Sequence, residues 1–228
     1  MNRRSTLLLV ALAGLAGCSA PGVAVSAASP SSSVAPDFGW VERDPALASG
    51  FCFTLVQGLT PVEVAERLGG TELERVEWVR LVSGGDGEQA GTDRYFIGVA
   101  RIGDWSLIVE DNGALGVAQK VISPLSAGRT VLVYRSDAAG RGRLLALRDE
   151  ELALDYDSGA PGTTTGTGLA EFQPALRAVG LVGDATVTSA VTEPTVPALE
   201  FLAEQTGVPL TRAQLTERTY LLVTVPKT

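Results

Sequence analysis

Residues 105–112 carry the densest group of side chains that could bind a ligand. Trp105 offers an aromatic platform. Beyond it come the carboxylates of Glu110 and Asp111 and the amide of Asn112. Together they could hold a sugar or a peptide, because aromatic rings stack and carboxylates and amides form hydrogen bonds. In an extended strand, however, Trp105 and Glu110 point to opposite faces, and Asp111-Asn112-Gly113 is typical of a turn. We weigh ligand binding against packing and turn formation, and we favour the latter.

A second group of carboxylates falls between residues 149 and 157. Asp155 and Asp157 share one face of a predicted strand. Three further acids precede them: Asp149, Glu150 and Glu151. Paired carboxylates could bind Ca²⁺ or cleave a glycosidic bond. The spacing does not match an EF-hand loop, since Gly159 comes one residue too early and no Glu stands at the twelfth position. A solvated acidic strand face is the interpretation that we favour.

The chain contains no histidine. This excludes the activation of Ser or Cys by His, and ordinary zinc sites. No glycine-rich phosphate loop follows a predicted strand, and Lys120 and Lys227 are the only lysines available as a base. We predict no cofactor and no metal site. A non-enzymatic role is favoured over catalysis, with carboxylate chemistry left open.

The first eighteen residues carry a processing signal. Arg3 and Arg4 precede an apolar run over residues 7–15, which is shorter than the about 20 residues that span a hydrocarbon core. The run ends in Leu15-Ala16-Gly17-Cys18, which resembles the lipobox of bacterial lipoproteins. The resemblance implies that residues 1–17 are a signal peptide and that Cys18 becomes the new N-terminus, carrying a diacylglyceryl group and a fatty acid such as palmitate. The alternative is an ordinary secretory signal with a chance cysteine near its cleavage site.

Residues 18–36 are predicted to form a flexible tether. They are rich in Ser, Ala and Pro and contain no charge and no large apolar side chain, so they cannot bury enough surface to fold. Residues 37–228 are long enough for a single domain with its own core. Anchor and tether would place this domain on the extracytoplasmic face of the bacterial cell membrane, held by the lipid on Cys18.

The charge balance narrows the choice of partners. The chain has 18 basic and 26 acidic residues, a net charge of −8, and removal of residues 1–17 takes away Arg3 and Arg4 and makes it −10. This sign argues against nucleic acid as a partner and against electrostatic adsorption to anionic lipid. The expected partners are the membrane, through Cys18, and an envelope protein.

Cys52 would be the only thiol left once Cys18 is acylated, so an intramolecular disulfide is ruled out. It lies between Phe51 and Phe53, with no basic neighbour close in sequence to activate it. We therefore expect Cys52 to be a small buried hydrophobic residue.

The elements that must position these residues follow from periodicity and turn residues. Thr60, Pro61 and Glu63 predict a capped helix that ends at Gly69-Gly70. Thr71 and Glu74 repeat the capping pattern and predict a helix toward residue 81, with a strand over residues 76–82 as the alternative. Further helices are expected near residues 114–125, 169–179, 197–205 and 211–217. Strands are expected at residues 51–57, 94–102, 105–110, 129–136, 143–148, 151–157 and 218–225.

The pair Gly103-Asp104 predicts a tight hairpin between two of these strands. A two-residue loop would pair Ile102 with Trp105, Ala100 with Leu107, and Gly98 with Val109. Gly98 would then leave room for the ring of Trp105. Taken together, the pattern predicts an α+β fold, a mainly antiparallel sheet of five to seven strands with helices packed on one side.

Several stretches resemble an actinobacterial domain family of unknown function. They are the segment from Gly58 to Gly70, the hairpin Gly103-Asp104-Trp105-Ser106-Leu107-Ile108-Val109-Glu110-Asp111-Asn112-Gly113, residues 129–157, Val179-Gly180-Leu181 and Gly207-Val208-Pro209-Leu210-Thr211. The resemblance covers most of residues 51–225 and implies no activity. The chain departs from the family at Asp149-Glu150, where the family usually has an Asp-Gly turn.

Three functional hypotheses remain open at this point. The leading one is a membrane-anchored lipoprotein domain with a non-enzymatic binding role. The second is an envelope hydrolase that acts through carboxylates, which requires two of them facing each other in a deep cleft. The third is an immunity or inhibitor protein whose acidic surface binds a basic partner.

Overall fold

The computed structural model describes residues 36–83, 93–183 and 190–227. Its strands are β1 (Gly50–Gln57), β2 (Thr71–Glu77), β3 (Arg94–Ile102), β4 (Trp105–Asp111), β5 (Thr130–Asp137), β6 (Gly142–Arg148), β7 (Glu151–Asp157) and β8 (Thr219–Pro226). Its α-helices are α1 (Trp40–Arg43), α2 (Pro61–Arg67), α3 (Trp78–Val82), α4 (Gln119–Ile122), α5 (Leu169–Ala178), α6 (Thr195–Thr206) and α7 (Arg212–Thr216). Short 3-10 helices are η1 (Pro45–Leu47), η2 (Leu115–Val117), η3 (Ser123–Ser126) and η4 (Pro161–Thr163).

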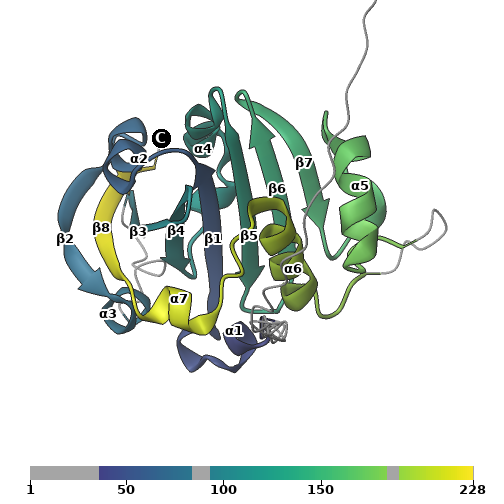
Figure 1. The fold of residues 1–228 in the computed structure, drawn as a ribbon, viewed down its shortest axis with the longest axis horizontal. Coiled ribbons are helices and arrows are strands. Elements are labelled where there is room, and N and C mark those ends of the chain that lie inside the picture. The colour runs from purple at the N-terminus through teal and green to yellow at the C-terminus, as the bar shows by residue number, and fades with distance from the viewer. Residues whose placement is uncertain (1–35, 84–92, 184–189, 228) are drawn as a thin grey trace, which may run out of the picture. The chain divides into compact units, whose positions relative to one another are not determined.

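The strands form one antiparallel sheet in the order β2-β8-β3-β4-β1-β5-β6-β7 (Figure 1). The predicted α+β class with an antiparallel sheet is confirmed. The predicted five to seven strands are too few, because the described residues hold eight. The three-strand meander β5-β6-β7 and the return of the last strand to the sheet follow the sequence pattern.

The additional strand is β2, where the capping pattern of Thr71 and Glu74 predicted a helix. Residues 71–77 instead pair with β8 at the edge of the sheet, with a bulge between Glu72 and Glu74. Only Val76 of this strand is buried, so a helix here would have had almost no apolar face to bury. Pairing with β8 satisfies the backbone instead, and α3 begins only at Trp78.

The predicted hairpin register is confirmed: Ile102 lies opposite Trp105, Ala100 opposite Leu107 and Gly98 opposite Val109. The reason given for Gly98 was wrong. A Cβ on Gly98 would come within 2.4 Å of Leu81 Cδ2, so it is Leu81 of α3, and not the ring of Trp105, that occupies the space.

Helices cover both faces of the sheet, which corrects the expectation of one covered side. Along β1, Phe51, Phe53 and Leu55 belong to one core cluster, while Cys52 and Val56 belong to another. Alternate residues of a strand point to opposite faces, so the two clusters lie on opposite sides. The major face, the side of Phe53, packs against α1, α3, α5, α6 and α7. The minor face, the side of Cys52, is covered by α2, η2, α4 and η3.

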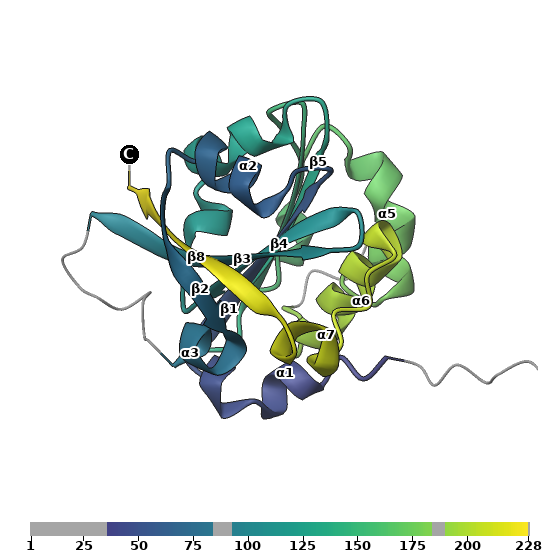
Figure 2. The same ribbon diagram turned by 60° about the vertical axis from the view of Figure 1, so that its left-hand side comes forward.

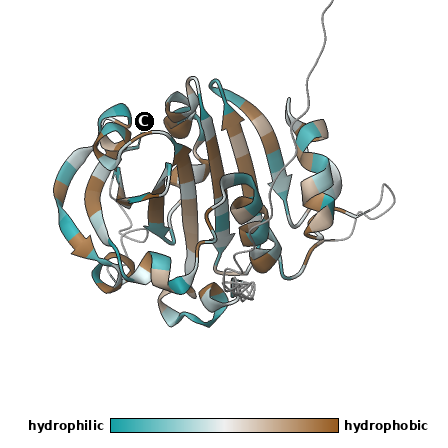
Figure 3. Ribbon diagram, in the orientation of Figure 1, coloured by the Kyte–Doolittle hydropathy of each residue, from teal (hydrophilic) through white to brown (hydrophobic). Residues whose placement is uncertain are grey.

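Figure 2 shows α5, α6 and α7 along one side of the sheet and α2 on the other. Hydrophobic residues concentrate in the central strands and on α6 (Figure 3). This pattern explains the double cover, because the central strands carry buried side chains on both faces and read as nearly continuous apolar runs.

Local capping explains the helices that were predicted correctly. The Thr60 side chain accepts a hydrogen bond from the Glu63 amide, and Glu63 accepts one from the Thr60 amide, which forms the predicted capping box of α2. The Thr211 side chain caps α7 by accepting a hydrogen bond from the Gln214 amide. The predicted helix over residues 114–125 is in fact three short pieces, η2, α4 and η3.

The signal peptide, Cys18 and most of the tether lie outside the described residues. Residues from Pro36 onward form one compact unit. Within the described ranges, none of the helices has the length and hydrophobicity needed to cross a membrane.

Candidate functional site

The four residues of the predicted ligand-binding group do not form one site. Trp105 is buried on the major face, and its indole Nε1 donates to the Thr206 carbonyl at 3.2 Å. Glu110 is buried on the opposite, minor face, since it lies beside Cys52 in the sheet register. Asn112 takes a left-handed φ of 49° and donates its amide to the Gly50 carbonyl at 3.0 Å, which is the turn role expected for it.

Glu110 and Asn112 do line one small hollow of about 80 Å³ at the end of β3 and β4, together with Arg94, Tyr95 and Lys227. The Lys227 ammonium lies 5.2 Å from the centre of the Tyr95 ring. A volume of this size holds a few water molecules and is too small for a sugar or a peptide side chain of any length.

The Glu110 carboxylate is fully engaged by the main chain of η2. One of its oxygens accepts from the Leu115 amide at 2.9 Å, and the other accepts from the Gly116 amide at 3.0 Å. The preceding loop is pressed against this carboxylate, because a Cβ on Gly113 would come within 2.2 Å of Glu110 Oε1. Glu110 therefore fixes η2 over the minor face of the sheet.

Cys52 lies between two charged residues in the sheet, Glu110 on β4 and Arg135 on β5. Its side chain is completely buried, and a Cβ on Gly116 would come within 2.6 Å of its sulfur. Burial raises the pKa of the Cys52 thiol well above its ordinary value, and the nearby negative charge of Glu110 raises it further. The expectation of a buried, unreactive thiol is confirmed as far as burial is concerned.

Burial likewise raises the pKa of the Glu110 carboxyl, against the opposing effect of its two amide hydrogen bonds. A buried acid with a raised pKa is often a catalytic acid or base. Here each oxygen of the carboxylate already accepts a main-chain hydrogen bond from η2, and the raised pKa follows from burial.

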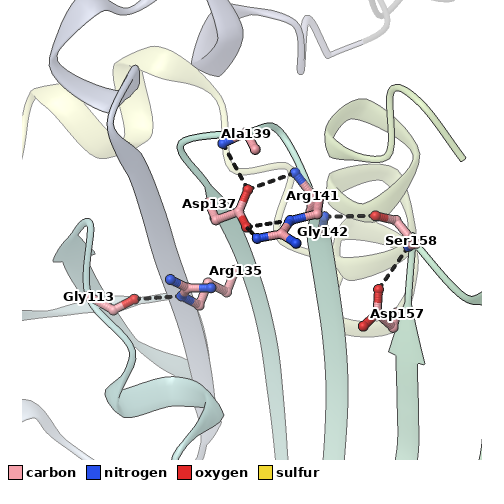
Figure 4. A network of polar contacts seen from close by, with 9 residues as sticks. Gly113, Arg135, Asp137, Ala139, Arg141, Gly142, Asp157 and Ser158 are labelled. Carbon is pink, nitrogen blue, oxygen red and sulfur yellow. Dashed lines mark hydrogen bonds and ion pairs between the residues drawn. The ribbon is translucent and has the colours of Figure 1, made fainter.

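Arg135 and Asp137 hold the end of β5 (Figure 4). Arg135 Nε donates to the Gly113 carbonyl at 3.0 Å, which adds a second hold on the loop before η2. Asp137 accepts from the amides of Ala139 and Arg141 and pairs with the Arg141 guanidinium at 2.7 Å. These contacts close the β5–β6 turn.

The second acidic group is also engaged within the fold. Asp155 accepts two hydrogen bonds from Arg143, at 3.0 and 2.8 Å. Asp157 accepts from the Gly159 amide at 2.8 Å, and Asp149 accepts from the Gly128 amide at 2.9 Å. These three carboxylates serve turns and a cross-strand ion pair.

A hollow of about 280 Å³ on the minor face was not foreseen from the sequence. It lies between β2, β3 and the start of β8, and three arginines line it: Arg75, Arg101 and Arg218. Arg75 and Arg218 are far apart in the sequence, and they come together only because β2 pairs with β8 and β8 with β3. No signal in the sequence indicated this hollow, because the capping pattern of Thr71 and Glu74 predicted a helix where β2 lies.

Of three comparisons with known proteins, one gives a match. A search of curated proteins and one of solved structures each gave no match. A family model does match, over residues 31–228, and its description is a family of unknown function, DUF6461. Because the match covers far more than half of the chain and includes every residue that the structure describes, the chain belongs to the DUF6461 family.

Proposed function

We propose that the protein is a lipid-anchored binding domain on the extracytoplasmic face of a bacterial membrane, with a non-enzymatic role toward another envelope component. The actinobacterial host implied by the sequence resemblance is part of this proposal. The anchor would be the acylated Cys18, and residues 18–36 would give the domain reach above the membrane.

The observation that supports a binding role over catalysis is the burial of Glu110 and the engagement of its carboxylate by the main chain. Glu110 is the most deeply buried carboxylate that the structure describes, and both of its oxygens accept main-chain hydrogen bonds. A catalytic carboxylate must be able to reach a substrate atom, and the hollow of about 80 Å³ that Glu110 lines is too small for a sugar or a peptide side chain. The alternative of a carboxylate-dependent hydrolase is disfavoured, because Glu110, Asp155 and Asp137 are all engaged by the fold.

The anchor is tested by expressing the full chain in an actinobacterial host that is fed a clickable palmitate analogue. We expect the wild-type chain to be labelled and to stay with the membrane fraction through a high-salt wash, because lipid and not surface charge holds it. Cys18→Ser should lose the label, whereas Cys52→Ser, a matched cysteine change, should keep it. An unlabelled wild-type chain would refute the anchor.

The binding role is tested with isolated envelopes and the full chain carrying Cys18→Ser, so that no acyl chain contributes to retention. We expect the chain to sediment with the envelopes in a saturable way and to release no soluble sugar or peptide fragments. Time-dependent release of such fragments would show turnover and would overturn the non-enzymatic role.

A further inference from the structure

The arginine-lined hollow has the composition of an anion site. Arg75, Arg101 and Arg218 line it together with apolar side chains such as Val99, and none of its lining residues among the described ranges is acidic. The chain as a whole carries 26 acidic against 18 basic residues. A hollow lined by three arginines is therefore locally positive in a chain whose net charge is negative, and a bound anion would explain this.

Two of the three guanidinium groups are held in place by main-chain carbonyls. Arg101 donates from Nε to the Gly103 carbonyl at 2.8 Å and from Nη1 to the Leu59 carbonyl at 2.6 Å. Arg218 donates to the Gln214 carbonyl and, from Nη1, to the carbonyl of Arg101 at 2.6 Å. Carbonyls fix the position of a guanidinium and leave its full charge in place. About three N–H groups remain on each of the two arginines for a ligand.

The side chain of Arg75 makes no hydrogen bond or ion pair with any residue that the structure describes, while its main chain pairs with Leu221. It extends from β2 next to Leu221 of β8, and Val99 of β3 flanks the same Leu221 from the other side. Arg75 and Val99 therefore stand on one sheet face, with the hollow between them.

Two carboxylates beside this hollow, Asp104 and Glu77, compete weakly for these arginines. Asp104 is fully exposed, and its Oδ1 lies 3.9 Å from Arg101 Nη2, at the outer limit of an ion pair. Glu77 accepts a hydrogen bond from the Thr219 hydroxyl at 3.1 Å. At physiological ionic strength charges are screened beyond about 8 Å, so the local arginines outweigh the net negative charge of the chain.

We propose that this hollow binds a phosphate group. A carboxylate is satisfied by one guanidinium fork, whereas a phosphate offers three or more oxygens and up to two charges, which suits three guanidinium groups. A volume of about 280 Å³ accommodates a phosphate with a small organic substituent. The phosphate could belong to a soluble phosphate ester or to the headgroup of an anionic phospholipid, and the chemistry of recognition is the same.

This inference deepens the proposed binding role and rests on it only in part, because the site can be tested without the anchor. The full chain carrying Cys18→Ser is titrated with inorganic phosphate in a calorimeter at low and at physiological salt. We expect saturable binding at one site that weakens as salt rises. Arg75→Gln should weaken it by about tenfold, the effect of losing one charged contact.

Arg75 is the informative position because its side chain has no polar partner among the described residues, so replacing that side chain should leave the pairing of β2 with β8 intact. The matched control is Arg177→Gln, the same charge change at an exposed position of α5 on the major face. We expect Arg177→Gln to bind phosphate like the unchanged chain. If both variants lose the same amount of phosphate affinity, the effect comes from the change in net charge, and the proposed site is refuted.

Vesicles distinguish the two sources of phosphate. The same chains are sedimented with vesicles of phosphatidylglycerol and with vesicles of phosphatidylcholine. Retention on phosphatidylglycerol that Arg75→Gln lowers and Arg177→Gln does not would identify a lipid headgroup. Binding of inorganic phosphate without such retention would identify a soluble ester.

Absence of phosphate binding up to roughly 10 mM, together with vesicle retention independent of Arg75, would refute the proposal. Neither result bears on the palmitate labelling, so failure of the site and failure of the anchor are distinguishable.

Discussion

Glu110 shows how a buried charge-bearing residue can serve the fold. Removing a carboxylate from water is unfavourable, and hydrogen bonds to its charged form offset that cost. Two main-chain amides, from Leu115 and Gly116, provide them at 2.9 and 3.0 Å. The same two bonds satisfy amides that η2 cannot satisfy itself. The side chain is therefore a structural clamp between β4 and the chain that crosses the minor face.

Glu110→Gln is expected to lower the free energy of unfolding by about 1–3 kcal/mol, because the Gln amide nitrogen would face a main-chain N–H and leave it without an acceptor. The measurement is urea unfolding followed by tryptophan fluorescence. The control is Glu66→Gln, the same change at an exposed position of α2. Equal midpoints for the two variants would contradict the clamp.

The raised pKa of Glu110 also sets the sign of a pH dependence. The folded chain holds the Glu110 proton more tightly than the unfolded chain, whose value is near 4.5. The resulting stabilisation is complete below the unfolded value and is lost as pH rises through the folded value. Exposed acids with lowered pKa values, such as Glu63 and Glu171, act in the opposite sense.

The comparison of wild type with Glu110→Gln removes the contribution of those other acids. We expect the wild type to gain stability relative to Glu110→Gln as pH falls from about 8 to about 5. The free energies come from urea unfolding at each pH. A difference that stays constant, or that grows with rising pH, would mean that the folded chain does not favour the protonated acid.

Cys52 should be chemically silent in the folded protein. Thiol reagents attack the thiolate, and burial together with the Glu110 charge raises the pKa of this thiol well above its ordinary value. With Cys18→Ser, Cys52 is the only thiol, and we expect a maleimide to label it at least about a hundredfold more slowly in buffer than in urea. Rapid labelling in buffer would show that the minor face opens easily.

At the scale of elements, the turn between β6 and β7 carries backbone strain. Asp149 and Glu150 both adopt positive φ, 49° and 67°, where a side chain costs energy. Two-residue turns of this kind favour Gly at the second position. Glu150→Gly should therefore raise the free energy of unfolding by about 1 kcal/mol, as measured by the thermal midpoint. Glu151→Gly, one residue later and inside β7, should lower it.

Local signals predicted much of the fold. The Gly103-Asp104 turn and the alternation around it were enough to predict the β3–β4 register, because a two-residue loop leaves a single pairing. The caps at Thr60 and Thr211 predicted α2 and α7 because each cap uses only residues within the first turn of its helix. Residues 71–77 were misread, because whether they form a helix or an edge strand depends on β8, nearly 150 residues away.

For the candidate sites too, features set by neighbouring residues were predicted, and features set by contacts distant in sequence were not. Strand alternation alone predicted that Trp105 and Glu110 would be separated, and they are. The arginine hollow needs Arg75, Arg101 and Arg218 to meet through two strand pairings, one of them with the misread β2. No spacing within the sequence marks such a site.

At the scale of the whole unit, two apolar cores share one sheet. Each central strand contributes alternate side chains to both, as Phe53 does to the major face and Cys52 to the minor face. The three tryptophans all lie on the major face, and the thiol of Cys52 lies on the minor face. Tryptophan fluorescence therefore reports on the packing of the major face, and the accessibility of the Cys52 thiol reports on that of the minor face.

Because neither core can lose its packing without disturbing the strands of the other, we expect both faces to unfold in one cooperative transition. In the Cys18→Ser chain, tryptophan fluorescence and a pulse of thiol labelling should give the same urea midpoint. Exposure of Cys52 at lower urea than the fluorescence change would mean that the short helices of the minor face detach first. In that case Glu110→Gln, which removes the clamp on η2, should widen the gap between the two midpoints, whereas Glu66→Gln should leave it unchanged. Coincident midpoints in wild type and in both variants would make the sheet and its two covers a single folding unit.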